Sequence, residues 1–319
     1  MLEGAWPVIE RFQILSLDGG GIKGLFSAAI LAHIEEDCGI NIVDHFDLIT
    51  GTSTGGIIAL GLGLGMRPKK IVDFYVKNGP AIFGKPGRGW FANKYQNDPL
   101  KAALREEGCF GERLLGESRK RLVIPSYNLG EDDVYLFKTP YHARLRRDYK
   151  VPAWKVAMAT SAAPTYFPAF GELDHVRLVD GGVWANNPTL VGIAEAVSML
   201  DVPLTSISVL SLGTTDEVKH RPDGLDGGGL WQWKEAAVDV IMRGQSVGAY
   251  TQAQHLLGKE KVTRIDPKVP DNLFKLDKLS EKELLAKAAH ESRISCPDIN
   301  QKFLAHNAEE SFPYKPMAQ

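Results

Sequence analysis

The chain has 319 residues, of which 44% are hydrophobic and 24% charged, and its formal net charge is −2. This composition is ordinary for a soluble globular protein and excludes a disordered, collagen-like or disulfide-scaffold protein. Because the basic excess of a nucleic-acid-binding protein is missing, we expect no DNA or RNA polymer as a partner. The three cysteines are too few and too scattered for a disulfide framework or a zinc site, which favours a reducing compartment.

Neither a signal peptide nor a membrane span is predicted. Residues 1–7 have no basic region followed by an apolar core. The longest uncharged run, residues 48–66, contains six glycines and four Ser or Thr residues, which is unlike a transmembrane helix. We therefore expect a cytoplasmic protein. Glycine is the one unusual residue type, because 12 of its 32 copies fall within the first 65 positions.

The first 66 residues predict two strand–turn–helix units. Residues 12–17 form a short β-type run that stops at Asp18 and three glycines, and residues 24–36 then show the four-residue spacing of an amphipathic helix. Residues 46–50 predict a second strand, and residues 57–66 predict a buried helix that is apolar or small on every side. This alternation is typical of a parallel α/β sheet that is covered on both faces.

The rest of the chain continues the pattern less regularly. Residues 78–97 have the composition of a loop or lid, with several aromatic side chains between positions 83 and 95. Further strands are predicted at residues 121–127, 134–137, 176–179 and 206–212, and helices at 154–161, 188–200, 233–257 and 284–294. A glycine-rich stretch at 223–229 divides the chain. We expect a catalytic core over residues 10–215 and a helical region over 216–319 that packs on it without forming an independent domain.

A nucleophile elbow is predicted at Gly51-Thr52-Ser53-Thr54-Gly55, which fits the pattern G-x-S-x-G between a strand and a helix. Such an elbow holds one side chain above the sheet, and the small flanking residues let the strand and helix backbones approach each other. The helix N-terminus adds partial positive charge near the serine oxygen. We therefore predict Ser53 as a nucleophile, with an ordinary glycine-rich turn as the alternative.

The segment Asp18-Gly19-Gly20-Gly21-Ile22-Lys23-Gly24 allows two functional interpretations. Three of its glycines match the G-x-G-x-x-G fingerprint of a dinucleotide-binding protein. Alternatively, the exposed N–H groups at a helix start stabilise an oxyanion. Both uses need glycine because no Cβ then obstructs a ligand that approaches the backbone. Ser53 supplies a candidate nucleophile on a second strand end, so the oxyanion hole is favoured.

Asp180-Gly181-Gly182 also follows a predicted strand, so we expect the Asp180 carboxylate at a strand's carboxyl end, where ligands of open α/β sheets gather. A serine hydroxyl needs a base to remove its proton. Asp180 is either that base or the group that orients a histidine. Among the eight histidines only His220 suits a triad in the order Ser, Asp, His, and a solvated loop histidine is the favoured interpretation of it.

Five segments in this order resemble the patatin-like phospholipases: residues 18–24, 51–55, 159–168, 180–182 and 185–188. The resemblance covers about residues 12–215. It implies a three-layer α/β/α fold with a mainly parallel central sheet, a nucleophile elbow and extra C-terminal helices.

In that family a serine and an aspartate form a catalytic dyad without a histidine. Carried over, Ser53 is the nucleophile, Asp180 is the base, and the glycine loop forms the oxyanion hole. The implied reaction is hydrolysis of fatty-acyl esters of membrane phospholipids through an acyl-serine intermediate. It needs no metal and no cofactor, and none is expected. Action on phospholipids implies transient contact with the inner face of the membrane.

Bacterial members of this size include effectors of antiphage defence that a cyclic oligonucleotide switches on. The chain resembles such an effector, although the catalytic motifs do not distinguish one from a housekeeping lipase. We therefore consider a cyclic di- or trinucleotide activator and a homo-oligomer. Two basic clusters, residues 113–121 and 144–150, are either phosphate contacts or solvated faces. The aromatic segment 83–95 is either a site of lipid entry or ordinary core.

Overall fold

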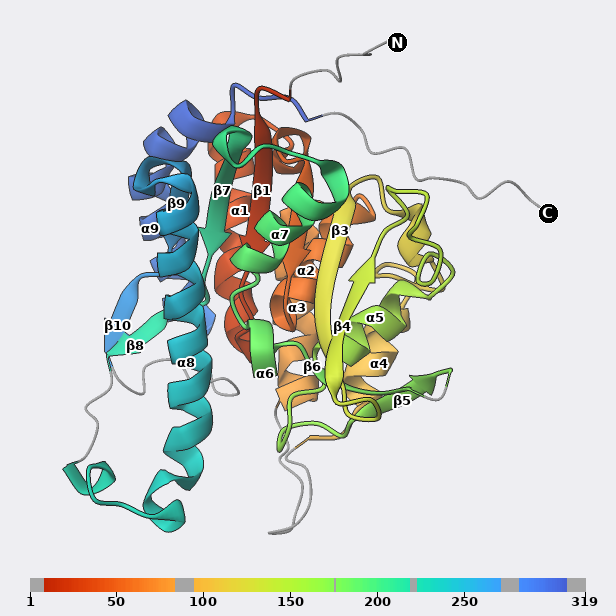
Figure 1. Ribbon diagram of the computed structural model, residues 1–319, viewed down its shortest axis with the longest axis vertical. Helices are drawn as coiled ribbons and strands as arrows, with labels where there is room; N and C mark the ends of the chain where they lie inside the picture. Colours follow the sequence, from red (N-terminus) through yellow and green to blue (C-terminus); the bar gives the residue numbers. More distant parts are fainter. Residues whose placement is uncertain (1–8, 84–94, 175, 219–222, 271–280, 309–319) are drawn as a thin grey trace, which may run out of the picture.

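The structure is a computed structural model that describes residues 9–83, 95–174, 176–218, 223–270 and 281–308 (Figure 1). The described residues form a central eight-stranded sheet in the order β5-β6-β3-β2-β1-β7-β9, with β4 paired to β3. Its strands are β1 (Phe12–Leu17), β2 (Leu48–Gly51), β3 (Arg121–Asn128), β4 (Asp133–Lys138), β5 (Phe170–Leu173), β6 (Val176–Asp180), β7 (Ile207–Leu212) and β9 (Val262–Ile265). A separate two-stranded sheet pairs β8 (Asp216–Val218) with β10 (Lys268–Pro270).

Helices cover both faces of the sheet, as Figure 1 shows, and so make three layers. One face carries α1 (Gly24–Cys38), α2 (Thr54–Gly63), α3 (Pro68–Phe83), α4 (Asp98–Arg105) and α5 (Ala153–Thr160). The other face carries α6 (Gly182–Ala185), α7 (Thr189–Leu200) and the long α8 (Leu230–Leu257). Successive side chains of β1 point to opposite faces of the sheet and so belong to two hydrophobic cores. Leu15 and Leu17 belong to the core on the face of α1 to α5, and Phe12 and Ile14 belong to the core on the face of α7 and α8.

The topology around β3 brings two strand ends together. β2 runs parallel to β3 and pairs with its first residues, whereas β6 runs antiparallel and pairs with its last residues. β4 pairs with residues 123–128 of β3, which include the whole stretch that β6 binds and the last residue that β2 binds. β2 and β6 therefore share the other edge of β3 and approach each other from opposite directions. Their carboxyl ends therefore meet. The expectation that Asp180 ends a strand is confirmed, but β6 is antiparallel to β3 rather than a further parallel strand.

The C-terminal region does more than cover the sheet with helices. β9 pairs in parallel with β7 and so adds an edge strand to the central sheet. The last helix, α9 (Glu281–Phe303), packs against α1, and α8 packs against α6 and α7. A purely helical region was expected because β8, β9 and β10 have only three or four residues each, too few for a periodic pattern.

Two further expectations concern loops. Residues 78–83, which we expected in a loop or lid, continue α3, because Ile82 is buried and extends the apolar face formed by Ile71 and Tyr75. Residues 84–94 of that segment lie outside the described residues, as does His220. The described ends of the segment meet, since the Phe83 and Tyr95 rings are 5.6 Å apart.

Candidate active site

Ser53 lies at a sharp turn between β2 and α2. Its backbone has φ 55° and ψ −122°, a conformation that a non-glycine residue rarely adopts and that signals a functional constraint. Two hydrogen bonds hold the turn: the Ser53 N–H donates to Thr160 Oγ1 at 3.0 Å, and the Ile57 N–H donates to the Ser53 carbonyl at 3.0 Å. This is the strand–turn–helix geometry of a nucleophile elbow.

The elbow depends on glycine at both flanks. A Cβ on Gly51 would lie 2.2 Å from the Gly55 carbonyl oxygen, and one on Gly55 would lie 2.2 Å from the Leu17 carbonyl oxygen. These contacts are with backbone atoms, which cannot rotate away as a side chain would. β1, β2 and α2 are therefore packed backbone to backbone around the serine.

Asp180 lies within reach of the Ser53 side chain, which acts on its carboxyl as a hydrogen-bond donor. Its carboxylate also accepts a hydrogen bond from the Gly182 N–H at 2.7 Å, and it is 5% exposed. Burial raises the pKa of Asp180 to about 6, while the hydrogen bonds from Ser53 and Gly182 act in the opposite direction. A carboxylate with this pKa is largely ionised at neutral pH and still basic enough to accept a proton.

The glycine loop, residues 19–24, lies against the serine. A Cβ on Gly19 would be 3.3 Å from Ser53 Cβ. The Gly19 N–H donates to the Asn186 carbonyl at 3.0 Å, so it does not point to a ligand as a free donor. Among the hydrogen bonds of the described residues, none uses the N–H of Gly20 or Gly21. These two groups are the loop donors that a ligand beside Ser53 would meet.

The remaining predicted residues support the frame of the site. The Thr52 hydroxyl donates to the Ala185 carbonyl at 2.6 Å, and the Lys23 ammonium donates to the Thr215 carbonyl at 3.3 Å. The hydroxyls of Thr54 and Tyr75 are hydrogen-bonded to each other.

Ile22 is buried, and Gly24 begins α1, with its N–H bonded to the Gly21 carbonyl. A Cβ on Gly181 would lie 2.4 Å from the Pro125 carbonyl oxygen.

Two residues near the site received no role from the sequence. Arg264 on β9 forms an ion pair with Asp18 at 2.7 Å, directly before the glycine loop, and a second with Asp266 at 2.7 Å. Burial raises the pKa of Asp18 to about 6, and Arg264 opposes that shift. No sequence pattern could connect positions 18 and 264, because they share only the adjacency of β1, β7 and β9 in the sheet.

Asn186 is the second such residue. Its Nδ2 donates to Ser246 Oγ of α8 at 2.9 Å, while its Oδ1 is buried without a hydrogen-bond partner among the described residues. That oxygen lies 2.5 Å from the position of a Cβ on Gly19 and 3.3 Å from one on Gly182. Asn186 therefore joins the glycine loop, the Asp180 segment and α8. The only feature of the sequence that pointed to Asn186 was the resemblance of residues 185–188 to a segment of the family.

Some arginines of the two basic clusters, residues 113–121 and 144–150, form contacts within the fold. Arg113 donates to the carbonyls of Leu64 and Phe110 at 2.8 and 3.2 Å, and Arg147 forms an ion pair with Asp148 at 2.7 Å. These contacts favour a structural interpretation of both arginines. Among the described residues, no group of three or more His, Cys, Asp or Glu side chains could hold a metal ion.

An α/β sheet with a strained serine at a strand–helix turn, beside a buried carboxylate and facing a glycine loop, defines a protein of the nucleophile-elbow class. The sequence model described as patatin-like phospholipase matches residues 15–193. The chain belongs to the patatin-like phospholipase family. The resemblance and the fold class inferred from the sequence are thereby confirmed, and the dinucleotide-binding alternative is disfavoured.

Curated relatives are similar over most of the chain. A protein of Pseudomonas aeruginosa named cGAMP-activated phospholipase is 30% identical and covers 96% of both chains. A protein of Vibrio cholerae with the same name is 35% identical over 72% of this chain and 73% of its own. Patatin-like protein 3 of Arabidopsis thaliana is 32% identical over 70% of this chain and 64% of its own.

The fold is also similar to a solved structure. VipD from Legionella pneumophila aligns with a TM-score of 0.55 at 13% identity, over 92% of this chain and 67% of that one. This similarity concerns the fold alone. In the part of the chain that the structure describes, no helix combines the length and apolar character that crossing a bilayer requires.

Proposed function

We propose that the protein is a serine acyl hydrolase of membrane phospholipids in which Ser53 is the nucleophile and Asp180 the base. The observation that carries this proposal is the meeting of two strand ends, which places Ser53, at the strained turn after β2, beside the buried Asp180 carboxylate at the end of β6. The N–H groups of Gly20 and Gly21 complete the arrangement, because the glycine loop lies against Ser53.

The reaction proceeds in two halves. Asp180 accepts the Ser53 proton as Oγ attacks the ester carbonyl, and the resulting oxyanion is stabilised by the N–H groups of Gly20 and Gly21. Protonated Asp180 then donates its proton to the departing alcohol, which leaves an acyl-serine. In the second half a water molecule attacks the acyl-serine, with Asp180 again accepting and returning a proton, and the fatty acid leaves.

The site's construction supplies the catalytic advantage. Each oxyanion donor contributes about 3 to 4 kcal/mol to stabilisation of the transition state in comparable sites. The backbone of Ser53, with φ 55°, fixes the hydroxyl in place before substrate arrives. Asp180 needs no histidine as intermediary, because its carboxylate itself lies within reach of the serine.

Apolar side chains beside the site support contact with a lipid surface. Val183, three positions after Asp180, is 40% exposed. Ile241 on α8 is 62% exposed, and its neighbour Met242 has its methyl group 3.4 Å from the position of a Cβ on Gly182. Exposed apolar groups that together form a patch mark sites of interaction with membranes or other proteins. We propose that Val183 and Ile241 contact the phospholipid layer.

We further propose that a cyclic dinucleotide activates the enzyme and that the activity serves antiphage defence. Support comes from the bacterial relatives named cGAMP-activated phospholipase, one of which aligns over 96% of this chain. The similarity therefore includes the C-terminal region, beyond the residues 15–193 that match the family model.

The test is release of fatty acid from phospholipid vesicles, with and without cGAMP and other cyclic di- and trinucleotides. Ser53→Ala and Asp180→Asn should each lower the rate at least about 1,000-fold. Ser198→Ala, an exposed serine on α7, serves as the control and should retain full activity. Near-normal activity of Ser53→Ala overturns the hydrolase proposal, while a wild-type rate that no cyclic nucleotide alters overturns only the activation.

A further inference from the structure

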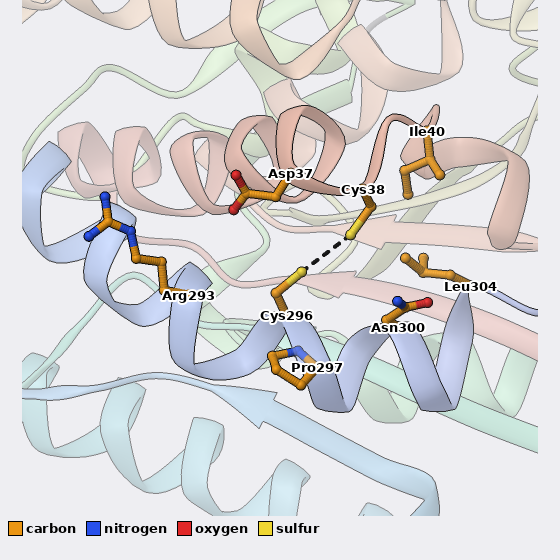
Figure 2. Close-up of a pocket in the computed structure, with 8 residues that line it drawn as sticks. All are labelled: Asp37, Cys38, Ile40, Arg293, Cys296, Pro297, Asn300 and Leu304. Carbon is orange, nitrogen blue, oxygen red and sulfur yellow. Dashed lines mark hydrogen bonds between the residues drawn. The ribbon is translucent and has the colours of Figure 1, made fainter.

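Two cysteines that are 258 positions apart meet on the surface of the molecule. Cys38 is the last residue of α1, and Cys296 lies within α9, which packs along α1. Their sulfur atoms are 3.2 Å apart and point toward each other across the two helices (Figure 2). The three cysteines are scattered along the sequence, and only tertiary packing places these two together.

The surroundings give small molecules access to this pair. Both cysteines line an open hollow of about 740 Å³ together with Asp37, Arg293 and Asn300 (Figure 2). Both are partly exposed. The third cysteine, Cys109, differs in both respects, since it is 5% exposed and burial raises its pKa to about 12. The two cysteines that meet are therefore the two that a reagent can reach.

We propose that Cys38 and Cys296 form a redox-modification site in which a reversible disulfide joins α1 to α9. This proposal is independent of the proposed hydrolase function. A disulfide requires the sulfurs to approach to about 2.05 Å, so the pair must close by roughly 1 Å. Pro297 follows Cys296 in α9 and has no N–H to donate, which leaves that turn of the helix easier to adjust.

The oxidant is a small-molecule disulfide of the glutathione class. One cysteine thiolate attacks it, forming a mixed disulfide and releasing one thiolate of the reagent. The second cysteine thiolate then attacks the protein sulfur of the mixed disulfide, forming the Cys38–Cys296 bond and releasing the other reagent thiolate. The two cysteines lose two electrons and two protons, and the reagent gains them as two thiols. Excess reduced thiol reverses both steps.

The thiol environment predicts a slow reaction at neutral pH. Burial, followed by the neighbouring Cys38 and Asp37, raises the pKa of Cys296 to about 11. Little of this thiol is then ionised at pH 7, and the thiolate is the reactive form. Other charged groups at the pocket include Arg293, which favours a thiolate by its positive charge.

The disulfide should affect stability more than catalysis. α1 begins at Gly24, the last residue of the glycine loop, and Cys38 is its fifteenth residue, so about 21 Å of helix separates the two ends. The bond would instead prevent α9 from separating from α1 and would close a very long loop in the unfolded chain. Such a constraint stabilises the native state by an amount that grows with loop length, and we expect Tm to rise by roughly 5 °C.

The test treats the full-length protein with oxidised glutathione, followed by thiol counting in denaturant and peptide mapping by mass spectrometry. We expect the loss of two of the three thiols, a peptide pair joined through Cys38 and Cys296, and a higher Tm that dithiothreitol reverses. Cys109→Ala should still form the cross-link, whereas Cys38→Ser and Cys296→Ser should not.

Three outcomes would overturn the proposal: stable mixed disulfides with glutathione, a covalent dimer in place of the intramolecular bond, or no loss of thiols after prolonged treatment at pH 8.5. None of these outcomes depends on phospholipid cleavage. The redox site and the hydrolase can therefore fail separately.

Discussion

Arg264 binds the carboxylate of Asp18 from a strand 246 positions further along the chain, with Nη2 2.7 Å from Oδ2. Its Nη1 donates to Ser211 Oγ at 2.8 Å, so the guanidinium links β9, β7 and the end of β1. Asp18 directly precedes the glycine loop. The C-terminal region therefore fixes the start of the segment that supplies the proposed oxyanion donors.

Replacing Arg264 should misplace the glycine loop. We expect Arg264→Gln to lower kcat between about 10- and 100-fold with little change in KM, because small displacements of transition-state donors cost that much. It should also lower the free energy of unfolding by about 3 kcal/mol, since Asp18 would remain buried without its partner. Steady-state kinetics on a soluble ester and denaturant unfolding measure the two effects.

Arg67→Gln is the matched control for this substitution. Arg67 also forms an ion pair with a buried carboxylate, that of Glu35, at 2.8 Å, but Glu35 lies in the last turn of α1, at the opposite end of the helix from the glycine loop. It should reduce stability and leave kcat unchanged. Equal losses of kcat in both variants would contradict a positioning role for Arg264.

The rate should depend on pH through Asp180. Its pKa of about 6 predicts that kcat/KM increases roughly tenfold per pH unit below 6 and levels off above 7, because only the carboxylate can accept the Ser53 proton. Asp18 has a similar pKa, so the profile of Asp18→Asn identifies the group. Retention of the acid limb in that variant assigns it to Asp180, and its disappearance assigns it to Asp18.

The Asp180 carboxyl should also make the stability of the protein depend on pH. The pKa of Asp180 is about 6 in the folded protein against an ordinary value of 3.8, so the native state holds this proton more tightly than the unfolded chain. Its stabilising contribution is complete below pH 3.8 and is lost as the pH rises through about 6. The difference corresponds to about 3 kcal/mol at pH 7.

Asp180→Asn removes this titration. Relative to the wild type, its free energy of unfolding should therefore increase by about 2 to 2.5 kcal/mol between pH 4 and pH 7, because the carboxyl of the unfolded chain is already partly ionised at pH 4. Urea unfolding of both proteins at the two pH values measures the change. A difference between variant and wild type that stays constant across this range would show that Asp180 titrates normally.

The elbow should not accept a methyl group at Gly55. We expect Gly55→Ala to lower the free energy of unfolding by at least about 3 kcal/mol and to abolish activity, because the new Cβ would collide with the Leu17 carbonyl oxygen. Gly244→Ala on α8, where nothing lies within 4 Å, should instead stabilise the protein by about 0.5 to 1 kcal/mol. Thermal unfolding compares the two variants, and similar effects would refute the steric argument.

Short-range patterns predicted the parts of the site that are continuous in sequence. Gly51 to Gly55 identified the turn at Ser53 because strand, small residues and helix follow one another directly. The glycine loop was recognised for the same reason, and both segments lie where a parallel sheet places its strand ends. The roles of Ser53 and Asp180 as nucleophile and base stay predictions.

Long-range pairings explain what the sequence did not reveal. That β6 is antiparallel and meets β2 end to end depends on which stretch of β3 each strand binds. Arg264 and Cys296 likewise acquire partners only when the C-terminal region folds back on β7 and α1. The hydrogen bond from the Gly19 N–H to the Asn186 carbonyl could not be predicted either, because it depends on the path of the backbone after Asp180.

The position of β7 also bears on how the protein can be dissected. The family match ends at residue 193, before β7 begins at Ile207, yet β7 pairs with all six residues of the fully buried β1. A fragment that stops at the family boundary would leave β1 with an open row of backbone donors and acceptors, and apolar strands of this kind readily recruit other chains. Attempts to produce a minimal catalytic domain should therefore retain the chain through β9, or aggregates are the expected product.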